Sequence, residues 1–397
     1  MSRQPPKAPG PRVLVAPNAF KGSLSPAAAA RAMASGIRRA WPQALCRELP
    51  LSDGGDGFGA ALATIPGSSW THSRARGPLL EEVRASTLWL PGGRTAVIEL
   101  ARTCGLRRVP RPGPASSVRT STFGLGEQIR TALEHGARRI VVGLGGSAST
   151  DGGAGAAQAL GFRLLDRSDR PIPAGGGGLV ELCRIEAGTD LPALRGIEIE
   201  AACDVDNPLL GPRGAAASFG PQKGAGAAEL ALLEEGLRRL ATVVARDLGE
   251  HPSPFAWGMG AAGGTGFGLA AFAGARVRSG AGLVAEALAL EGALDWTELV
   301  VTGEGRLDLA SFGGKATGEI LRQARSRGLP TLLVAGSAED EAVVRLRRLG
   351  AGLVLTADGG LPPTSGLEAS HQLRRALELA CRDPAIGGRW RQRLSPG

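Results

Sequence analysis

Short apolar runs that give way within about three residues to glycine, proline or an acidic residue set the strongest limit on the fold of this chain. Five of them lie at Val13–Ala16, Ile140–Gly143, Leu299–Val301, Leu332–Val334 and Leu353–Leu355. Continuous runs rich in β-branched residues are typical of strands buried on both faces of a parallel sheet. Helical patterns alternate with them, over residues 25–40, 125–135, 154–160, 227–248, 283–290, 317–327, 340–349 and 368–381. We therefore expect an α/β fold with largely parallel sheets.

The length and the order of these runs indicate two domains. A chain of 397 residues has enough material for about two cores. We expect one Rossmann or flavodoxin-like domain, made of residues 12–60 and 295–397. The second α/β domain, residues 61–294, is then inserted into the first. Residues 1–11 are polar and rich in proline, without the apolar core of a signal peptide, so we expect a disordered leader.

Composition narrows the class of function. The net charge of +9 rests mostly on scattered arginines, and the chain has no tyrosine and no aromatic cluster among its basic residues, so we expect no nucleic-acid partner. No apolar run approaches the length of a membrane span, so we expect no membrane partner either. The five cysteines form no CxxC pair, which favours a reduced, cytoplasmic protein. The four isolated histidines argue against a zinc site and against a Ser-His-Asp hydrolase.

Lysine is rare here, and its positions point to anion binding. Only four of the 46 cationic residues are lysines, and Lys21, Lys223 and Lys315 each lie beside glycine. Small and charged residues concentrate in five segments, namely Ala16–Ser23, Ser52–Gly57, Gly145–Gly155, Asp204–Gly224 and Thr302–Lys315. Glycine lets backbone N–H groups approach phosphate oxygens, lysine adds charge, and carboxylates hold Mg²⁺ or accept a hydroxyl proton. Together the segments predict a phosphoryl-transfer site, although each alone also fits a tight turn with an aspartate cap.

Three common motifs do not fit. Gly258–Gly263 matches GxGxxG, but no convincing strand precedes it, so a dinucleotide fingerprint is not favoured. A Walker A loop is absent because Ala316 follows Lys315. Asp53–Gly57 resembles the beginning of a calcium loop but lacks the alternating ligands and the final glutamate.

Taken in order, these segments resemble the bacterial glycerate kinase type 1 family from about Arg12 to about Asp358. The family patterns APDSFKGSLS, DGGEG and GGSATNDGGAG are matched by Ala16–Ser25, Asp53–Gly57 and Gly145–Gly155. ACDVxNPLxGxxGA, FGPQKGA, GAAGGxGxG and TGEGRxDxQTxxGK are matched by Ala202–Ala215, Phe219–Ala225, Gly260–Gly268 and Thr302–Lys315. The resemblance implies ATP-dependent phosphorylation of the 2-hydroxyl of D-glycerate, with Mg²⁺ accompanying ATP. It also implies an active site in the cleft between two α/β domains.

On this basis we assign roles as hypotheses. Lys21, together with Lys223, Lys315 or both, neutralises the ATP phosphates or the glycerate carboxylate, and Arg306 captures that carboxylate. Asp204 is the base that orients the attacking hydroxyl, with Asp308 as the alternative. Asp53, Asp151 and Glu304 are candidates for Mg²⁺ or its waters. The remaining substrate- and phosphate-binding candidates are Ser23, Gly54, Gly55, Gly152, Gly153 and Asn207.

The sequence departs from the family pattern at several of these places. Asn18, Asp56 and Thr150 stand where Asp, Glu and Asn are usual, and Gly313 and Ala316 replace a frequent His and Pro. Two alternatives follow. One is a kinase for another small hydroxy acid, and the other is a metabolite-binding regulator without catalysis.

Overall fold

The protein consists of two compact units. The computed structural model describes residues 10–20, 22–52, 54–55, 57–189, 194–249, 251–308, 311, 316–348, 352–356 and 365–384. Unit 1 is formed by Met1–Asp53 and Ala281–Gly397, and unit 2 by Gly54–Gly280. The chain thus leaves unit 1 once and returns to it once. The sequence predicts these two transitions after residues 60 and 294.

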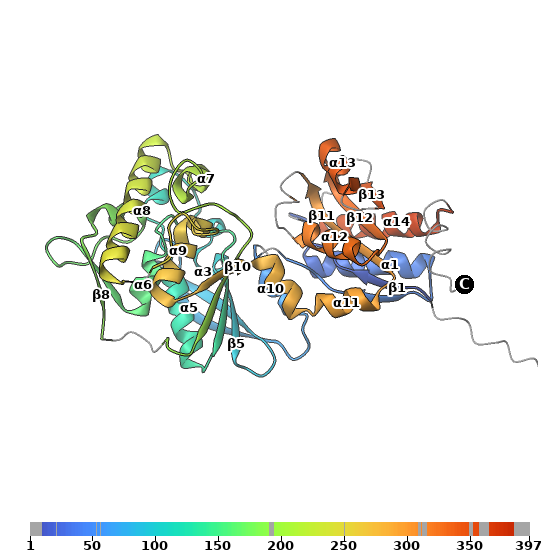
Figure 1. The fold of residues 1–397 in the computed structure, drawn as a ribbon, viewed down its shortest axis with the longest axis horizontal. Coiled ribbons are helices and arrows are strands. Elements are labelled where there is room, and N and C mark those ends of the chain that lie inside the picture. The colour runs from blue at the N-terminus through green and yellow to red at the C-terminus, as the bar shows by residue number, and fades with distance from the viewer. Residues whose placement is uncertain are drawn as a thin grey trace, which may run out of the picture. The chain divides into compact units, whose positions relative to one another are not determined.

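Unit 1 is a parallel five-stranded sheet with helices packed against it (Figure 1). Counted along the chain, its strands lie in the order 2-1-3-4-5, and every neighbouring pair is parallel. This is the flavodoxin-like order. Its elements are β1 (Arg12–Val15), α1 (Pro26–Ala40), β2 (Leu45–Glu48), α10 (Gly280–Ala287, beginning at the last residue of unit 2), α11 (Leu290–Trp296), β11 (Leu299–Leu307), α12 (Ala316–Ser326), β12 (Thr331–Ala338), α13 (Asp340–Arg348), β13 (Leu353–Thr356) and α14 (Gly366–Arg382).

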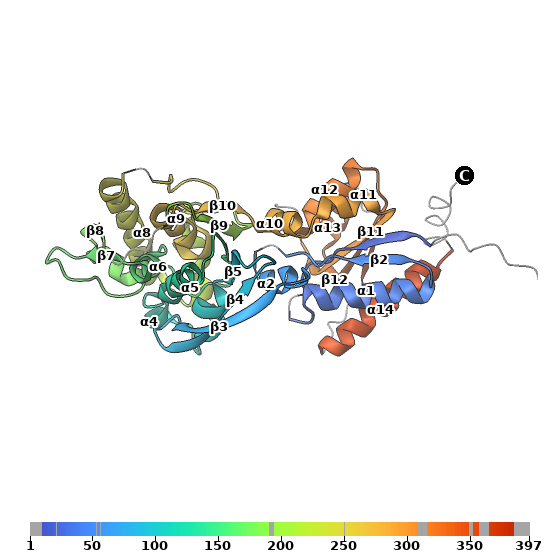
Figure 2. The same ribbon diagram turned by 90° about the horizontal axis from the view of Figure 1, so that it is seen from below.

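Local sequence explains how α1 is formed and where it packs. Ser25 caps the helix by accepting a hydrogen bond from the Ala28 N–H at 3.3 Å, and proline occupies the first helical position. Its buried face packs with β1, β11 and α14 in one apolar core. A Cβ at Gly36 would lie 2.2 Å from the Arg374 carbonyl oxygen, so glycine allows α1 and α14 to approach closely. Figure 2 shows these two helices side by side along one face of the sheet.

Unit 2 contains a mixed six-stranded sheet in the order β10-β9-β6-β5-β4-β3. Strands β5, β6, β9 and β10 run parallel, whereas β3, β4 and β5 pair antiparallel. The elements of this unit are α2 (Phe58–Leu62), β3 (Ser69–Arg76), β4 (Glu82–Trp89), β5 (Thr95–Glu99), α3 (Ala101–Cys104), η1 (Leu106–Arg108), α4 (Pro114–Ser117), α5 (Phe123–Glu134), β6 (Arg139–Gly143), α6 (Ala154–Leu160), β7 (Phe162–Leu165), η2 (Gly176–Glu181), β8 (Arg184–Ala187), β9 (Glu198–Cys203), α7 (Ala215–Phe219), η3 (Pro221–Lys223), α8 (Ala227–Asp247), α9 (Ala261–Ala273) and β10 (Arg276–Ser279).

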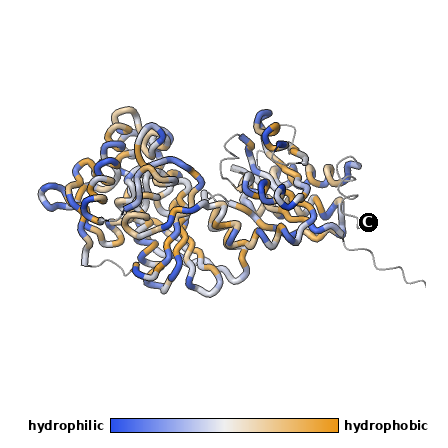
Figure 3. Tube along the Cα trace, viewed as in Figure 1, coloured by the Kyte–Doolittle hydropathy of each residue, from blue (hydrophilic) through white to orange (hydrophobic). Residues whose placement is uncertain are grey.

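Small residues determine the packing of unit 2. Its core contains many alanines together with leucines and isoleucines from the sheet and from α5, α6, α8 and α9. Polar and apolar residues alternate along the long helices, as expected where one face is buried (Figure 3). These findings confirm the predicted α/β class with largely parallel sheets. No helix in the described ranges is both long enough and apolar enough to cross a bilayer.

Candidate active site

The strand order of unit 1 puts its topological switch point between β1 and β11. In a 2-1-3-4-5 sheet, the connections leave these two strands in opposite directions, and ligands bind beyond their carboxyl ends. The chain after β1 stays beside β11, because the Asn18 N–H donates to the Gly303 carbonyl at 2.8 Å. On its other side, the Leu51 N–H donates to the Pro17 carbonyl at 2.9 Å. Three of the glycine-containing segments identified in the sequence therefore meet at this edge.

Buried polar side chains gather at the same edge. Asn18 is 5% exposed and Glu304 is 7% exposed, while the Thr302 hydroxyl donates to the Ala16 carbonyl at 2.7 Å. The hydroxyl groups of Ser52 and Thr317 are buried and have no hydrogen-bond partner among the described residues. Unsatisfied buried hydroxyls are unusual in an apolar core, so this edge has the character of a polar binding site.

Two predicted residues farther along β11 already have protein partners. The Arg306 side chain is 71% exposed, and its Nη2 lies 2.9 Å from Glu339 Oε1. This ion pair raises the pKa of the guanidinium. Asp308 Oδ1 accepts hydrogen bonds from the N–H and the hydroxyl of Ser311, at 3.1 and 3.3 Å. Arg306 would have to leave Glu339 to bind a substrate carboxylate, and Asp308 holds a turn.

The other predictions for unit 1 rest mainly on residues outside the described ranges. Lys21, Asp53 and Lys315 lie there. Ser23 is described and is half-buried in a turn in which its N–H donates to the Phe20 carbonyl at 2.8 Å. That turn leads directly into the cap of α1.

In unit 2, glycine backbones meet at the carboxyl ends of the parallel strands. The Gly145 N–H, just after β6, donates to the Gly54 carbonyl at 3.2 Å. A Cβ on Gly145 would lie 2.3 Å from the Gly55 Cα, so neither loop has room for a side chain there. Within the described part of the chain, the N–H groups of Gly55 and Gly146 have no hydrogen-bond partner, and both residues are accessible. Gly146 also has a positive φ of 72°, a conformation found in anion-binding turns.

Asp204 extends from the end of β9 in the same region. Its Oδ1 accepts a hydrogen bond at 2.7 Å from the hydroxyl of Ser279, the last residue of β10. The next carboxylate, Asp206, forms an ion pair at 2.6 Å with Arg213, and this pair lowers the pKa of Asp206. The Asn207 Nδ2 donates to the Arg213 carbonyl at 2.8 Å and to a neighbouring serine hydroxyl. The side-chain N–H groups of Asn207 are thus used within the protein, by the loop and by Ser218 of α7.

Asp151 is the centre of a buried hydrogen-bond network and is fully inaccessible. Its Oδ2 accepts from the N–H and the hydroxyl of Thr122, both at 2.8 Å, and from the Gly155 N–H at 3.2 Å. Its Oδ1 accepts from the Gly153 N–H at 3.2 Å. Four donors satisfy a carboxylate, so the structure does not support Asp151 as a metal ligand.

Two glycine-rich segments interlock behind this network: the first glycine loop, Gly145–Gly155, and the second glycine loop, Gly258–Gly268, which runs into the kinked beginning of α9. The Gly152 N–H donates to the Gly263 carbonyl at 3.0 Å, and the Gly153 N–H is used by Asp151. A Cβ on Gly263 would lie 2.0 Å from the Ser149 carbonyl oxygen. The N–H groups of Gly152 and Gly153 are therefore committed to the protein, in contrast to the predicted contact with phosphate. Gly146, at the other end of the first loop, is exposed, and its N–H has no partner among the described residues.

Lys223 is also committed to this network. Its side chain is 3% exposed, and its Nζ donates to the Ser149 carbonyl and lies 3.4 Å from the Thr150 hydroxyl. Burial lowers the pKa of Lys223 to about 7, and the charge of Asp151 partly opposes this shift. A buried amine bonded to a backbone carbonyl does not support the predicted phosphate contact.

Comparison with known proteins now decides the family. The model of the glycerate kinase family matches residues 13–378. A glycerate kinase of Bacillus subtilis is 40% identical over 374 residues, covering 93% of this chain and 97% of the relative. A glycerate 2-kinase of Escherichia coli is 40% identical over 337 residues, covering 84% and 87%. A crystal structure titled as a putative glycerate kinase 2 from Salmonella typhimurium is 38% identical with a TM-score of 0.82, covering 96% and 99%.

The chain belongs to the glycerate kinase family. The resemblance drawn from the motifs is thereby confirmed. Two accessible features were not among the predicted site residues, namely Gly146 and Ser279. Gly146 lay within a quoted motif, but which of its glycines keep a free N–H depends on the fold. Ser279 gave no signal beyond a serine before glycine at the end of a short strand.

The residues present fit the nucleotide and cation that a glycerate kinase uses. The N–H groups of Gly55 and Gly146, which have no partner among the described residues, suit phosphate oxygens, and the backbones of the two loops approach closely because a Cβ on Gly145 would lie 2.3 Å from the Gly55 Cα. No group of three or more metal-ligating side chains occurs among the described residues. Mg²⁺ commonly keeps several waters and uses one or two carboxylates together with phosphates, so Glu304 can serve it without such a group.

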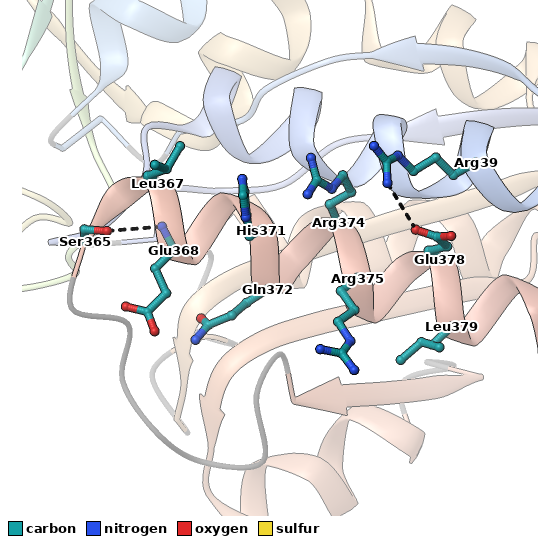
Figure 4. A pocket seen from close by; sticks show the side chains of 10 residues that line it. All are labelled: Arg39, Ser365, Leu367, Glu368, His371, Gln372, Arg374, Arg375, Glu378 and Leu379. Atoms are coloured by element: carbon teal, nitrogen blue, oxygen red, sulfur yellow. Dashed lines mark hydrogen bonds and ion pairs between the residues drawn. The ribbon is translucent and has the colours of Figure 1, made fainter.

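A groove elsewhere in unit 1 does not include any of the predicted residues. It has a volume of about 720 Å³ and runs along α14. In Figure 4, His371 and Arg374 point toward α1, whereas Gln372 and Arg375 point to the other side of the helix. The groove is not part of the candidate active site.

Proposed function

We propose that the chain transfers the γ-phosphoryl group of ATP to the 2-hydroxyl of D-glycerate, giving 2-phosphoglycerate and ADP. The observation that carries the proposal is the family match, which spans both units. The choice of the 2-hydroxyl follows the relative named glycerate 2-kinase.

Unit 2 supplies the phosphate contacts in this proposal. The N–H groups of Gly55 and Gly146 donate to phosphate oxygens, because both residues are accessible and neither N–H has a partner in the part of the chain that the structure describes. Fixed backbone donors stabilise the charge that is redistributed during phosphoryl transfer. Lys21 and Lys315 remain the proposed cationic contacts.

Asp204 is the proposed base. Its carboxylate accepts a hydrogen bond from Ser279, which fixes its orientation at the end of β9. An oriented carboxylate can accept the proton of the attacking hydroxyl as the new O–P bond forms. Mg²⁺, when bound, neutralises phosphate charge, and Glu304 and Asp53 are its proposed ligands. Arg306 is the proposed partner of the substrate carboxylate, which would replace Glu339 in its ion pair.

A substrate panel tests the proposal. ADP release is measured with D-glycerate, tartronate, lactate and tartrate, each with Mg·ATP. We expect clear preference for D-glycerate. Asp204→Asn should lower kcat by at least about a hundredfold, since general-base catalysis contributes roughly that much. Asp206→Asn is the matched control, because Asp206 is also a carboxylate after β9 but is paired with Arg213. Near-normal turnover by Asp204→Asn would reject the base assignment.

One observation favours a second candidate substrate. Asn18 is buried at the β1–β11 edge, where the family pattern has an aspartate. Its amide can donate hydrogen bonds as well as accept them, so this edge could suit a different hydroxy acid. Preference for tartronate, lactate or tartrate in the same panel would support that alternative.

A further inference from the structure

We infer that Lys223 is a positioning residue, which holds the buried half of the Gly145–Gly155 loop in place through the Ser149 carbonyl and does not itself contact phosphate. The inference rests on the proposed function, in which the accessible half of this loop binds ATP.

The two halves of the loop have different environments. Ser149, Thr150 and Asp151 are fully buried, whereas Gly146 is exposed. Lys223 reaches only the buried half, through the Ser149 carbonyl and the Thr150 hydroxyl. To meet a ligand at Gly146, its Nζ would have to leave the buried Ser149 oxygen with only the long hydrogen bond of 3.4 Å from the Ser147 hydroxyl, which is unfavourable.

Lys223 also joins three segments. It ends η3, it contacts the first glycine loop at Ser149, and the same carbonyl packs against Gly263 of the second glycine loop. Gly152 connects the two loops directly through its N–H. Removing the amine therefore removes a hydrogen bond that holds the buried half of the first glycine loop, to which Gly146 is connected. We expect the loop to become less ordered, so that the N–H of Gly146 is held less firmly in place.

The chemistry of the amine separates positioning from phosphate binding. Asp151 is the charged group that acts on Lys223. An amine can donate a hydrogen bond to a carbonyl whether it is charged or neutral, but attraction to phosphate needs the charge. If Lys223 bound phosphate, the KM for ATP would rise up to about tenfold per pH unit once the amine lost its proton. A positioning role predicts a KM for ATP that is nearly constant between about pH 7 and 8.5.

Amine labelling of the wild-type protein gives a direct test. The protein is treated with an acetylating reagent at about pH 8, with and without Mg·ATP, and Lys223 is followed by peptide mass spectrometry. At this pH an accessible amine of such low pKa would react readily, so burial is the property measured. We expect Lys223 to stay unmodified in both samples. Modification without nucleotide and protection by Mg·ATP would overturn the inference.

Hydrogen exchange provides the second readout. Lys223→Met removes the donor while keeping an unbranched side chain, and Arg238→Met removes an exposed cation of α8 as a control. We expect faster amide exchange across residues 146–153 in the first variant alone. Unchanged exchange together with a KM for ATP raised tenfold or more would contradict a positioning role. Labelling and exchange do not depend on turnover. An inactive wild type would therefore reject the proposed function, whereas the positioning role of Lys223 would still be decided by labelling and exchange.

Discussion

Lys223→Met should change how the stability of the protein depends on pH. In the folded chain burial lowers the pKa of this amine from 10.5 to about 7. In the unfolded chain it keeps its ordinary pKa near 10.4. Between these values the unfolded chain binds one more proton than the folded chain, so the contribution of Lys223 makes the protein more stable as pH rises.

The size of the effect follows from the same two pKa values. Each full proton of difference changes the free energy of unfolding by about 1.4 kcal/mol per pH unit. With the folded amine half-protonated at about pH 7, the integrated gain up to about pH 8.5 is roughly 1.6 kcal/mol. Higher pH is unsuitable, because burial raises the pKa of the Cys104 and Cys203 thiols to about 12. Their unfolded forms titrate near pH 8.5 to 9, and they lower stability as pH rises above that.

The assay is urea unfolding of the wild type and of Lys223→Met at several pH values between about 7 and 8.5. Subtracting the two curves cancels the titration of groups that both proteins share. We subtract the free energy of unfolding of the variant from that of the wild type. We expect this difference to increase by roughly 1.6 kcal/mol as the pH rises over this range. Equal pH dependence of the two proteins would refute the reasoning that a buried, largely neutral amine occupies this position.

Three further predictions concern unit 2. Asp151→Asn should lower the free energy of unfolding by about 2–4 kcal/mol, because an amide cannot accept from four donors. Urea unfolding measures this loss, and a loss below about 1 kcal/mol would contradict the hydrogen-bond network around Asp151. Gly263→Ala should destabilise the protein much more than Gly274→Ala, since both have positive φ but only Gly263 lacks space for a Cβ; equal shifts in melting temperature would contradict the interlocked loops. Ser279→Ala should lower kcat on glycerate by about tenfold through the loss of one hydrogen bond to Asp204; an unchanged kcat would remove Ser279 from the site.

Strong local signals made much of the fold predictable. The cap at Ser25 and the alanine-rich run after it predicted α1, and the alternation of apolar runs with helical patterns predicted the parallel sheets. The antiparallel strands β3 and β4 were not predicted. Their sequences mix arginine, serine and threonine with few continuous apolar residues, because β3 lies at the edge of its sheet and is largely exposed on both faces. Pairing with β5 decides their structure more than local preference does.

The site was less predictable for a physical reason. Asp151 and Lys223 have the same local pattern, a charged residue beside glycine, that a phosphate site would use. Whether such a charge faces a ligand or a buried carbonyl depends on which segments pack behind it. Likewise, Gly146 and Gly152 belong to one motif, but only the fold shows that Gly152 has given its N–H to a neighbouring loop.

The identity of the product tests the proposed function most directly. The purified protein is incubated with Mg·ATP and D-glycerate, and the product is identified by ³¹P and ¹³C NMR. We expect stoichiometric ADP and a phosphate ester on the 2-hydroxyl. Phosphorylation of the 3-hydroxyl would contradict the proposed position of transfer, and the absence of any phosphorylated glycerate would contradict the proposed function itself.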